Sequence, residues 1–274
     1  MLQSVARYTN PPRLKIVDLT LKNADDSINL CIGSKPGFEL AREEKRQWLE
    51  KRLSHGVGGK LAYSDGQLAG MVEYSPIEYA PFPVSGDSLL HINCIWVLPR
   101  FQRMTIGENL VRSCISEART RGKRGLSVLA YGATFFMPAT FFVRQGFRTV
   151  QRRGSQELMW KELQPCKPPG FLPMAFSPER DEAKVAVDVL YSAQCPWSIM
   201  TRDRIERVSR EFSGAVKVRL IDTEDRRALA KFGESRKVFV NGNETFFAPP
   251  TEGDIRKVFE TCTKSLERES RTRV

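Results

Sequence analysis

The sequence predicts an α/β protein built from two folded units that are joined by a proline-rich linker. Strand-like and helix-like hydrophobic patterns alternate along the chain, which is typical of α/β proteins. The stretch "QPCKPPGFLPMAFSPERDEAK" carries five prolines in 21 residues, and proline interrupts helices and central strands. A length of 274 residues suits two domains of ordinary size. We therefore expect a first unit at residues 1–163, a linker at 164–184 and a second unit at 185–274.

The first unit is expected to contain a sheet with flanking helices. Strands are predicted from their apolar patterns at residues 14–20, 60–76, 89–99, 125–131 and 147–163. The second and last of these ranges are hairpins, and the first hairpin turns at Asp65-Gly66. Helices are predicted, each with a glycine at or just after its end, at residues 38–56, 106–122 and 138–145.

The second unit repeats the alternation on a smaller scale. Its strands are predicted at residues 185–192, 216–222 and 237–248, the last range being a hairpin. The dipeptide Asn241-Gly242 predicts a type I′ turn in that hairpin. Helices are predicted at residues 198–212, 225–233 and 252–265, and the charged end of the chain, 264–274, is expected to fray.

Composition limits the class of protein. Hydrophobic residues make up 41% and charged residues 27%, as in soluble globular proteins. No apolar run reaches the roughly 18 residues of a membrane span, and the first residues lack the apolar core of a secretory signal. The six cysteines are scattered without a C-x-x-C pair, so we expect no metal site, no disulfide framework and a cytoplasmic location. A net charge of +11 favours an anionic partner, but no basic helix interleaved with aromatic residues indicates nucleic acid.

The stretch "VLPRFQRMTIGENLV", residues 97–111, has the pattern of an anion-binding loop. An apolar strand ends at Pro99, a Gln102-Arg103 pair follows, and Gly107 opens a helix. Backbone N–H groups of such a loop, together with the positive end of the helix, can hold a pyrophosphate without a dedicated cationic side chain.

This loop and the later "FFVRQGF" resemble the GNAT superfamily of acyl-CoA transferases, whose pyrophosphate loop reads Gln/Arg-x-x-Gly-x-Gly/Ala. More narrowly, "HINCIWV", "GLSVLAY", "FVRQGF" and "YSAQCPWS" are similar to YoaP-like proteins. That resemblance implies a GNAT fold, with a mixed, mostly antiparallel sheet and flanking helices, followed by a smaller thioredoxin-like α/β domain. It also implies a direct transfer of an acyl group, in the first place acetyl, from the pantetheine thioester of acetyl-CoA or another acyl-CoA to a small-molecule amine.

The resemblance also assigns the donor site. Pantetheine is expected to run beside the strand residues Ile95, Trp96 and Val97. The pyrophosphate is expected on the loop residues Gln102, Arg103, Met104, Thr105, Ile106 and Gly107. Thr105 departs from the family pattern, in which this position is glycine. Its branched Cβ disfavours positive φ and crowds the loop, although its hydroxyl can donate to phosphate.

Three residues are candidates for the chemistry. His91 stands eleven residues before Gln102, at the position of the family's general base, and an imidazole titrates near neutrality. Strict alternation is expected to place His91, Asn93, Ile95 and Val97 on one face of the strand. Glu73 on the neighbouring strand is expected to position the amine or to orient His91. Phe142 stands where many GNAT enzymes have a tyrosine acid, so Tyr131 is the candidate substitute.

Two other functions remain open at this stage. In the first, the basic residues near the loop bind an acidic acyl carrier protein whose phosphopantetheine arm delivers the acyl group, as in secondary-metabolite biosynthesis. These basic residues are Arg100, Arg103, Arg112, Arg119, Arg121, Lys123 and Arg124. Alternatively, the loop binds CoA in a non-catalytic or sensor module, which the missing glycine and tyrosine favour.

The second unit has one candidate thiol. In "YSAQCPWS", Cys195 precedes a predicted helix and matches the first cysteine of a thioredoxin active site. The resolving cysteine is replaced by Ser198, and Arg236 stands at the position of the thioredoxin cis-proline. We therefore expect a degenerate module that shapes the acceptor site or a partner surface, with monothiol exchange as the alternative.

Overall fold

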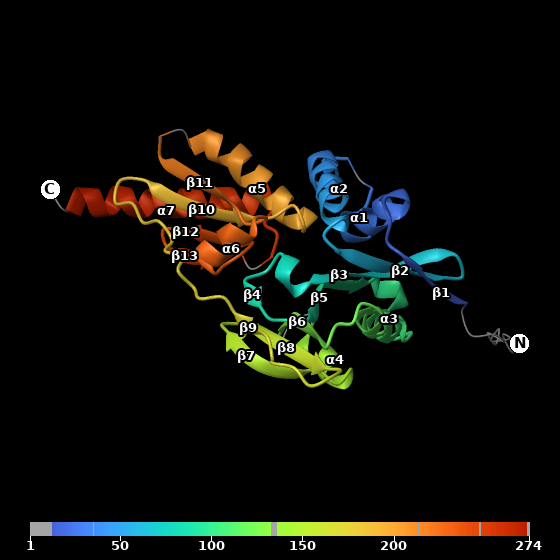
Figure 1. Ribbon diagram of the computed structural model, residues 1–274. Coiled ribbons are helices and arrows are strands. Elements are labelled where there is room, and N and C mark those ends of the chain that lie inside the picture. The colour runs from blue at the N-terminus through green and yellow to red at the C-terminus, as the bar shows by residue number, and fades with distance from the viewer. Residues whose placement is uncertain (1–12, 35, 133–135, 213, 247, 273–274) are drawn as a thin grey trace, which may run out of the picture.

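The computed structural model describes residues 13–34, 36–132, 136–212, 214–246 and 248–272. Within them the chain forms one seven-stranded sheet, one four-stranded sheet and a small two-stranded sheet. Figure 1 shows the seven-stranded sheet with its helices on one side of the molecule and the four-stranded sheet with its helices on the other.

The first unit has the strand order β1-β2-β3-β5-β6-β8-β7. Every pair is antiparallel except β5 and β6, which are parallel. The strands are β1 (Leu14–Asp18), β2 (Gly58–Ser64), β3 (Gln67–Pro76), β5 (Leu89–Val97), β6 (Gly125–Tyr131), β7 (Arg148–Arg153) and β8 (Gln156–Glu162). The predicted mixed, mostly antiparallel sheet is thereby confirmed.

Four α-helices flank this sheet. They are α1 (Ala24–Ile32), α2 (Glu39–Leu53), α3 (Ile106–Thr120) and α4 (Ala139–Arg144), and short 3-10 turns occur at Leu21–Asn23, Ile77–Tyr79 and Pro99–Phe101. The helices α2, α3 and α4 were predicted, whereas α1 was not. Nine residues with two aspartates and a serine give too short a periodic pattern to identify α1 from sequence.

The second unit has the strand order β11-β10-β12-β13, with β10 and β11 parallel and the other pairs antiparallel. Asn241 and Gly242 both have positive φ, as the predicted type I′ turn requires. The elements are β10 (Val185–Tyr191), α5 (Pro196–Ser209), a 3-10 turn (Arg210–Phe212), β11 (Val216–Asp222), α6 (Arg226–Phe232), β12 (Val238–Val240), β13 (Asn243–Thr245) and α7 (Glu252–Thr272).

The prediction that residues 264–274 fray is wrong for most of this stretch, because α7 continues to Thr272. Its last turns contain leucine, glutamate, arginine and lysine, which are strong helix formers. Charge repulsion is also limited, because acidic and basic residues are mixed in this segment.

The linker is extended and is held by both units. Its residues Gly170–Phe171 form β9, which pairs with β4 (Val84–Ser85) of the first unit. Farther along, the backbone N–H groups of Ala175 and Phe176 donate to the carbonyl of Phe232 in the second unit, at 3.1 and 2.9 Å. The linker therefore connects the two sheets through backbone hydrogen bonds and does not hang free between them.

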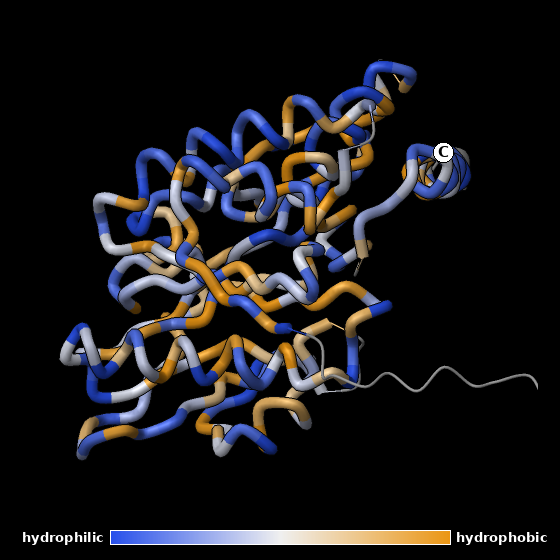
Figure 2. The backbone as a smooth tube through the Cα atoms, turned by 90° about the vertical axis from the view of Figure 1, so that its right-hand side faces the viewer, coloured by the Kyte–Doolittle hydropathy of each residue, from blue (hydrophilic) through white to orange (hydrophobic). Residues whose placement is uncertain are grey.

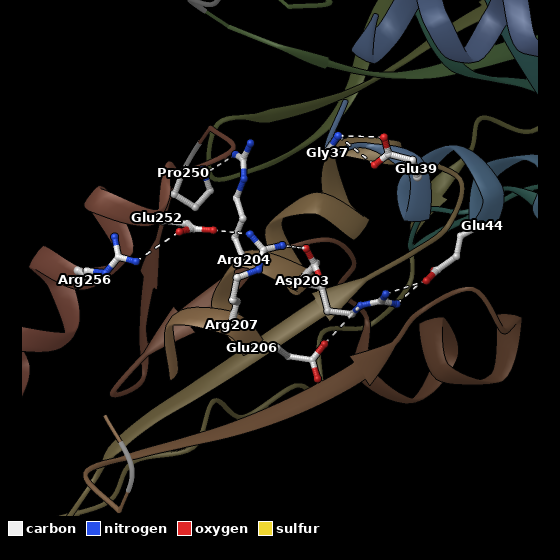
Figure 3. Close-up of polar contacts among 11 residues, drawn as sticks. Gly37, Glu39, Glu44, Asp203, Arg204, Glu206, Arg207, Pro250, Glu252 and Arg256 are labelled. Carbon is white, nitrogen blue, oxygen red and sulfur yellow. Dashed lines mark hydrogen bonds and ion pairs between the residues drawn. The ribbon is translucent and has the colours of Figure 1, made fainter. Parts of the chain in front are cut away.

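A hydrophobic core is shared between the units. Buried residues of α1, α2, β2 and β3 pack in one cluster with Ala193, Ile199 and Met200 of the second unit. Helix α5 lies beside α2 (Figure 1), and the Arg202 guanidinium of α5 pairs with Glu44 of α2 at 2.7 Å. Figure 3 shows the Glu44 side chain and the ion pair of Arg256 with Glu252 in α7. Hydrophilic and hydrophobic residues alternate along the peripheral helices (Figure 2). Among the described residues, no helix has the length and hydropathy of a membrane span.

Candidate active site

The sheet of the first unit opens between its two parallel strands. Strands β5 and β6 pair only from Leu89 to Ile92 with Gly125 to Val128. Each then continues on its outer side, β5 against β3 to Val97 and β6 against β8 to Tyr131. Beyond Ile92 and Val128, no described strand pairs with the facing edges of β5 and β6, although Tyr131 of β6 forms an isolated bridge with Pro138. Such edges offer backbone N–H and C=O groups to a ligand that lies between the strands.

A β-bulge lies where this opening begins. Glu73 faces Cys94 and Tyr74 faces Ile92, so Asn93 is the extra residue on β5. The predicted alternation is wrong at this point, because the bulge shifts the side-chain period. Ile95 packs with Ile92 in the cluster on the α3 side, whereas His91 contacts Phe82 and Asn93 hydrogen-bonds Glu73.

The loop before α3 has the backbone of an anion site. Arg103 and Thr105 have φ values of 64° and 59°, in the left-handed region, and Gln102 donates from its side chain to the carbonyl of Val97. Thr105 is the N-cap residue of α3, but its hydroxyl donates back to the carbonyl of Met104 at 2.7 Å. No described side chain caps the helix, so its first N–H groups are available to an anion.

Thr105 occupies a conformation in which glycine is favoured. A β-branched residue at positive φ is strained, by about 1–3 kcal/mol. The GNAT pattern places glycine here, so the backbone retains the shape of the motif although the side chain has changed.

Gly107 lies in the first turn of α3 against α4. A Cβ atom at this position would stand 3.3 Å from two ring carbons of Phe141 and 3.8 Å from Val97. Glycine therefore allows the beginning of α3 to approach α4 and the end of β5 closely. The other residues predicted for the donor site lie on the same stretch of chain. Trp96 and Val97 end β5, Met104 is exposed, and Ile106 is buried.

Most of the basic residues considered from sequence lie away from this loop. Arg121 pairs with Glu117 and donates to the carbonyl of Gly56, and Lys123 stands 3.9 Å from Glu78. Arg112 pairs with Glu108 on the exposed side of α3. Only Arg100 and Arg103 belong to the loop itself, and both are exposed.

Glu73 is the centre of a buried polar network. Its side chain is 2% exposed, and its Oε2 pairs with Lys45 Nζ of α2 at 2.5 Å. Its Oε1 accepts from Gln194 Nε2 at 2.7 Å and from Asn93 Nδ2 at 3.4 Å. Lys45 also donates to the main-chain carbonyl of Gln194 at 2.7 Å. The Glu73 carboxylate is thus held by one cation and two side-chain amides.

His91 is fully buried beside this network. Its Nδ1 lies 2.9 Å from Ser127 Oγ, and its ring packs 5.2 Å from Phe82. Its Nε2 has no hydrogen-bond partner among the described residues. Burial, followed by the positive charges of Arg226 and Arg236, lowers the pKa of His91 to about 3. The imidazole is therefore neutral at physiological pH and a much weaker base than a free histidine.

The two aromatic positions considered for acid catalysis differ in exposure. Tyr131 ends β6 at the opening between the strands, and it is half-buried next to Phe136. Phe142 is fully buried in the core of the first unit, with edge-to-face contacts to Phe141 and Phe147. Phe142 is thus a core residue, and Tyr131 is the tyrosine that stands at the strand opening.

Three thiols lie around the Glu73 network. Burial, then the negative charge of Glu73, raises the pKa of Cys94 to about 12, and burial raises the pKa of Cys31 well above its usual value. Cys195 is the N-cap residue of α5, as predicted, and Ser198 accepts from the backbone N–H of Ser192 at 3.1 Å. The buried thiols Cys31 and Cys94 are therefore protonated and unreactive.

The sequence did not predict that Lys45, Gln194 and Arg236 belong to the polar network around Glu73. A signal for Lys45 was available: it shares a helix face with Ala41, Trp48 and Leu49, so a charged residue stands in an apolar stripe. Gln194 and Arg236 gave no comparable signal, because their partners are distant in sequence.

The opening between β5 and β6 thus lies in the same unit as the helix N-terminus of α3 and the buried carboxylate of Glu73. Residues 27–147 match the family model described as acetyltransferase (GNAT) family. This part of the chain is therefore a GNAT acetyltransferase domain.

The chain is similar over both units to the uncharacterized N-acetyltransferase YoaP of Bacillus subtilis strain 168. The two are 24% identical over 234 residues, covering 82% of this chain and 90% of the relative. Among solved structures, the PaiA N-acetyltransferase of Thermoplasma acidophilum in complex with coenzyme A is 16% identical, with a TM-score of 0.42, over 55% of this chain and 99% of that one. A GNAT acetyltransferase of Brucella melitensis in complex with acetyl-CoA is 17% identical, with a TM-score of 0.39, over 57% and 92%.

Proposed function

We propose that the protein transfers an acetyl group directly from acetyl-CoA to a small-molecule amine. The observation that carries this proposal is the opening between β5 and β6, which leads to the uncapped N-terminus of α3. The relatives from Thermoplasma and Brucella were solved with coenzyme A and acetyl-CoA, which agrees with this donor.

The donor is proposed to bind along the end of β5 and over the loop. The pantetheine arm is an extended amide chain, which suits the end of β5 at Ile95, Trp96 and Val97, where β6 no longer pairs with β5. The pyrophosphate would accept from backbone N–H groups between Gln102 and Gly107. This backbone cradle does not depend on the side chain at position 105.

On the acceptor side, we propose Glu73 as the group that holds and orients the amine, which loses its proton to water. His91 was the predicted base, but a pKa near 3 leaves it little driving force to take a proton. Glu73 is oriented by its neighbours and located on the strand next to the opening. The role predicted for His91 stays a prediction, which the pH experiment below tests.

The proposed reaction is a single displacement. The amine nitrogen forms a bond to the thioester carbonyl carbon, the carbon–sulfur bond breaks, and its electrons go to the CoA sulfur. The amine loses one proton, and the released thiolate gains one. Tyr131 stands at the opening and is the proposed donor of that second proton, because Phe142 has no proton to give.

A donor bound to a carrier protein is the second candidate. Exposed Arg100 and Arg103 at the loop favour it, since acidic carrier proteins dock on basic surfaces. A non-catalytic CoA sensor is the third, favoured by Thr105 and Phe142 where the family has glycine and tyrosine.

We further propose that residues 185–274 form a degenerate thioredoxin-like domain. The proposed boundaries of the two units are residues 163 and 184. The proposed location of the protein is the cytoplasm. Support for the domain comes from a parallel β-α-β segment followed by a hairpin and a helix, with Cys195 at the start of the first helix. Ser198 stands at the position of a resolving cysteine. The proposed role of this domain is therefore to shape the acceptor side and not to exchange disulfides.

Release of CoA thiol tests the function. We expect thiol release from acetyl-CoA with at least one amine of a panel that includes amino acids, polyamines and aminoglycosides. Mass spectrometry should then show that amine with the mass of one acetyl group added. The same panel is repeated with an acetyl-loaded carrier protein. Transfer only from the carrier protein would contradict the acetyl-CoA proposal, and CoA binding without transfer from either donor would identify a sensor.

A further inference from the structure

The acceptor-side carboxylate of the first unit is held by a side chain of the second unit. We infer that Gln194 is a positioning residue for Glu73, and that Arg236 fixes Gln194 in turn. This inference rests on the proposed function, in which Glu73 handles the acceptor amine.

All four polar groups of Gln194 are engaged. Its side-chain Nε2 donates to Glu73 Oε1 and its Oε1 accepts from Arg236 Nη1, both at 2.7 Å. Its main-chain carbonyl accepts from Lys45 at 2.7 Å, and its N–H donates to Ser192 Oγ at 3.3 Å. The residue is 3% exposed, so water does not replace these partners readily.

The chemistry of the two neighbours fixes the orientation of the amide. Arginine can only donate and an ionised carboxylate can only accept, so the reversed amide would face each neighbour with the wrong group. The chain Arg236 to Gln194 to Glu73 therefore has one direction. The positive charge of Arg236 polarises the amide toward Glu73 and strengthens that hydrogen bond.

Arg236 is held in place by its own surroundings. Its guanidinium stacks over the ring of Phe82 of the first unit at 4.3 Å. Its backbone has a φ of 48°, which is rare for a residue other than glycine, asparagine or aspartate. Such strained residues concentrate at functional sites. Lys45, also from the first unit, contacts both Gln194 and Glu73, so the network crosses the boundary between the units twice.

The test uses the full chain with Gln194→Met, which keeps the length of the side chain and removes both polar atoms. We expect kcat/KM for the amine to fall about 10- to 100-fold, as for one hydrogen bond to a charged group, while the affinity for CoA is unchanged. Glu44→Gln is the matched control, because it removes a different charge pair between the same units, that of Arg202. It should change neither quantity.

A second readout does not need turnover. The infrared carboxylate band of Glu73 is identified as the difference between wild type and Glu73→Gln. Gln194→Met should shift this band and Glu44→Gln should not. If wild type acetylates no amine, the proposed function fails, and the band shift still tests the positioning. An unshifted band and unchanged kcat/KM in Gln194→Met, or an equal effect of Glu44→Gln, would overturn the inference.

Arg236 is tested by a double-mutant cycle. If Arg236 acts through Gln194, Arg236→Gln lowers kcat/KM in the wild-type background and has little further effect in Gln194→Met. Equal effects in both backgrounds would overturn this link. If Gln194→Met does not fold, Gln194→Asn serves instead, because the shorter amide cannot reach Glu73 and Arg236 together.

Discussion

The donor side and the acceptor side of this site are built in different ways. The donor side uses backbone groups from one continuous stretch, residues 95–107, and the acceptor side uses buried side chains that reach from Lys45 to Arg236. The loop keeps its left-handed backbone with threonine at position 105. A buried polar network is less tolerant of change, because each member left without its partner is destabilising.

The largest expected effect is the loss of the acceptor-side carboxylate. Glu73→Gln should lower kcat/KM for the amine by about 100-fold or more, because the amine is no longer held in place for attack. It should also lower the free energy of unfolding by about 3–5 kcal/mol, because Lys45 stays buried without a counter-charge. Steady-state kinetics and urea unfolding measure the two effects.

A double variant separates these effects. Adding Lys45→Met to Glu73→Gln removes the unpaired charge, so stability should recover while activity should not. Recovery of transfer in the double variant would mean that Glu73 only neutralises Lys45.

On the donor side, Gly107→Val is expected to weaken CoA binding by about 10–100-fold. The new side chain would press on Phe141 and intrude at the start of α3, where the phosphate is proposed to bind. Ser116→Val, on the exposed face of the same helix, controls for the low helix propensity of valine. Calorimetry showing equal CoA affinity in Gly107→Val and wild type would remove the loop from the donor site.

The buried histidine makes stability depend on pH. The unfolded chain protonates His91 near pH 6.5 and the folded chain only near pH 3, so between these values the unfolded state binds more protons. This residue therefore lowers the free energy of unfolding as pH falls from about 7, by up to about 1.4 kcal/mol per pH unit. His91→Gln should reduce that slope in urea unfolding between pH 4 and 7.

The same variant tests catalysis by His91. With a pKa near 3, His91 should give no ascending limb near pH 6.5 in kcat, and His91→Gln should keep the wild-type profile. A limb near the imidazole pKa that disappears in His91→Gln would restore the histidine as the base.

The smallest expected effect is a gain. Thr105→Gly should raise the free energy of unfolding by about 1 kcal/mol, because relief of the left-handed strain exceeds the entropy cost of glycine. CoA affinity should be retained or improved. Arg103→Gly, at a similar φ but without a β-branch, should gain less. A loss of stability in Thr105→Gly would show that the hydroxyl contact to Met104 outweighs the strain.

The contrast also explains what the sequence could predict. A donor loop could be proposed from the sequence because strand, loop and helix follow one another within a few residues. The sheet was predicted correctly because its strands carry clear patterns and its hairpins clear turns. Ile95 was wrongly predicted to share the face of His91, because a single bulge at Asn93 reverses the alternation and nothing in the local sequence marks a bulge. Gln194 and Glu73 are 121 positions apart, so only the packing of the two units brings them together.

The core shared by the two units can form only after α5 of the second unit has been synthesised. Leu49 and Ile199 belong to one buried cluster, but 150 residues separate them along the chain. At about 5–20 residues per second, a ribosome needs roughly 8–30 s to make that interval. During this time the apolar face of α1 and α2 has been synthesised but lacks the residues of α5 that cover it in the folded protein.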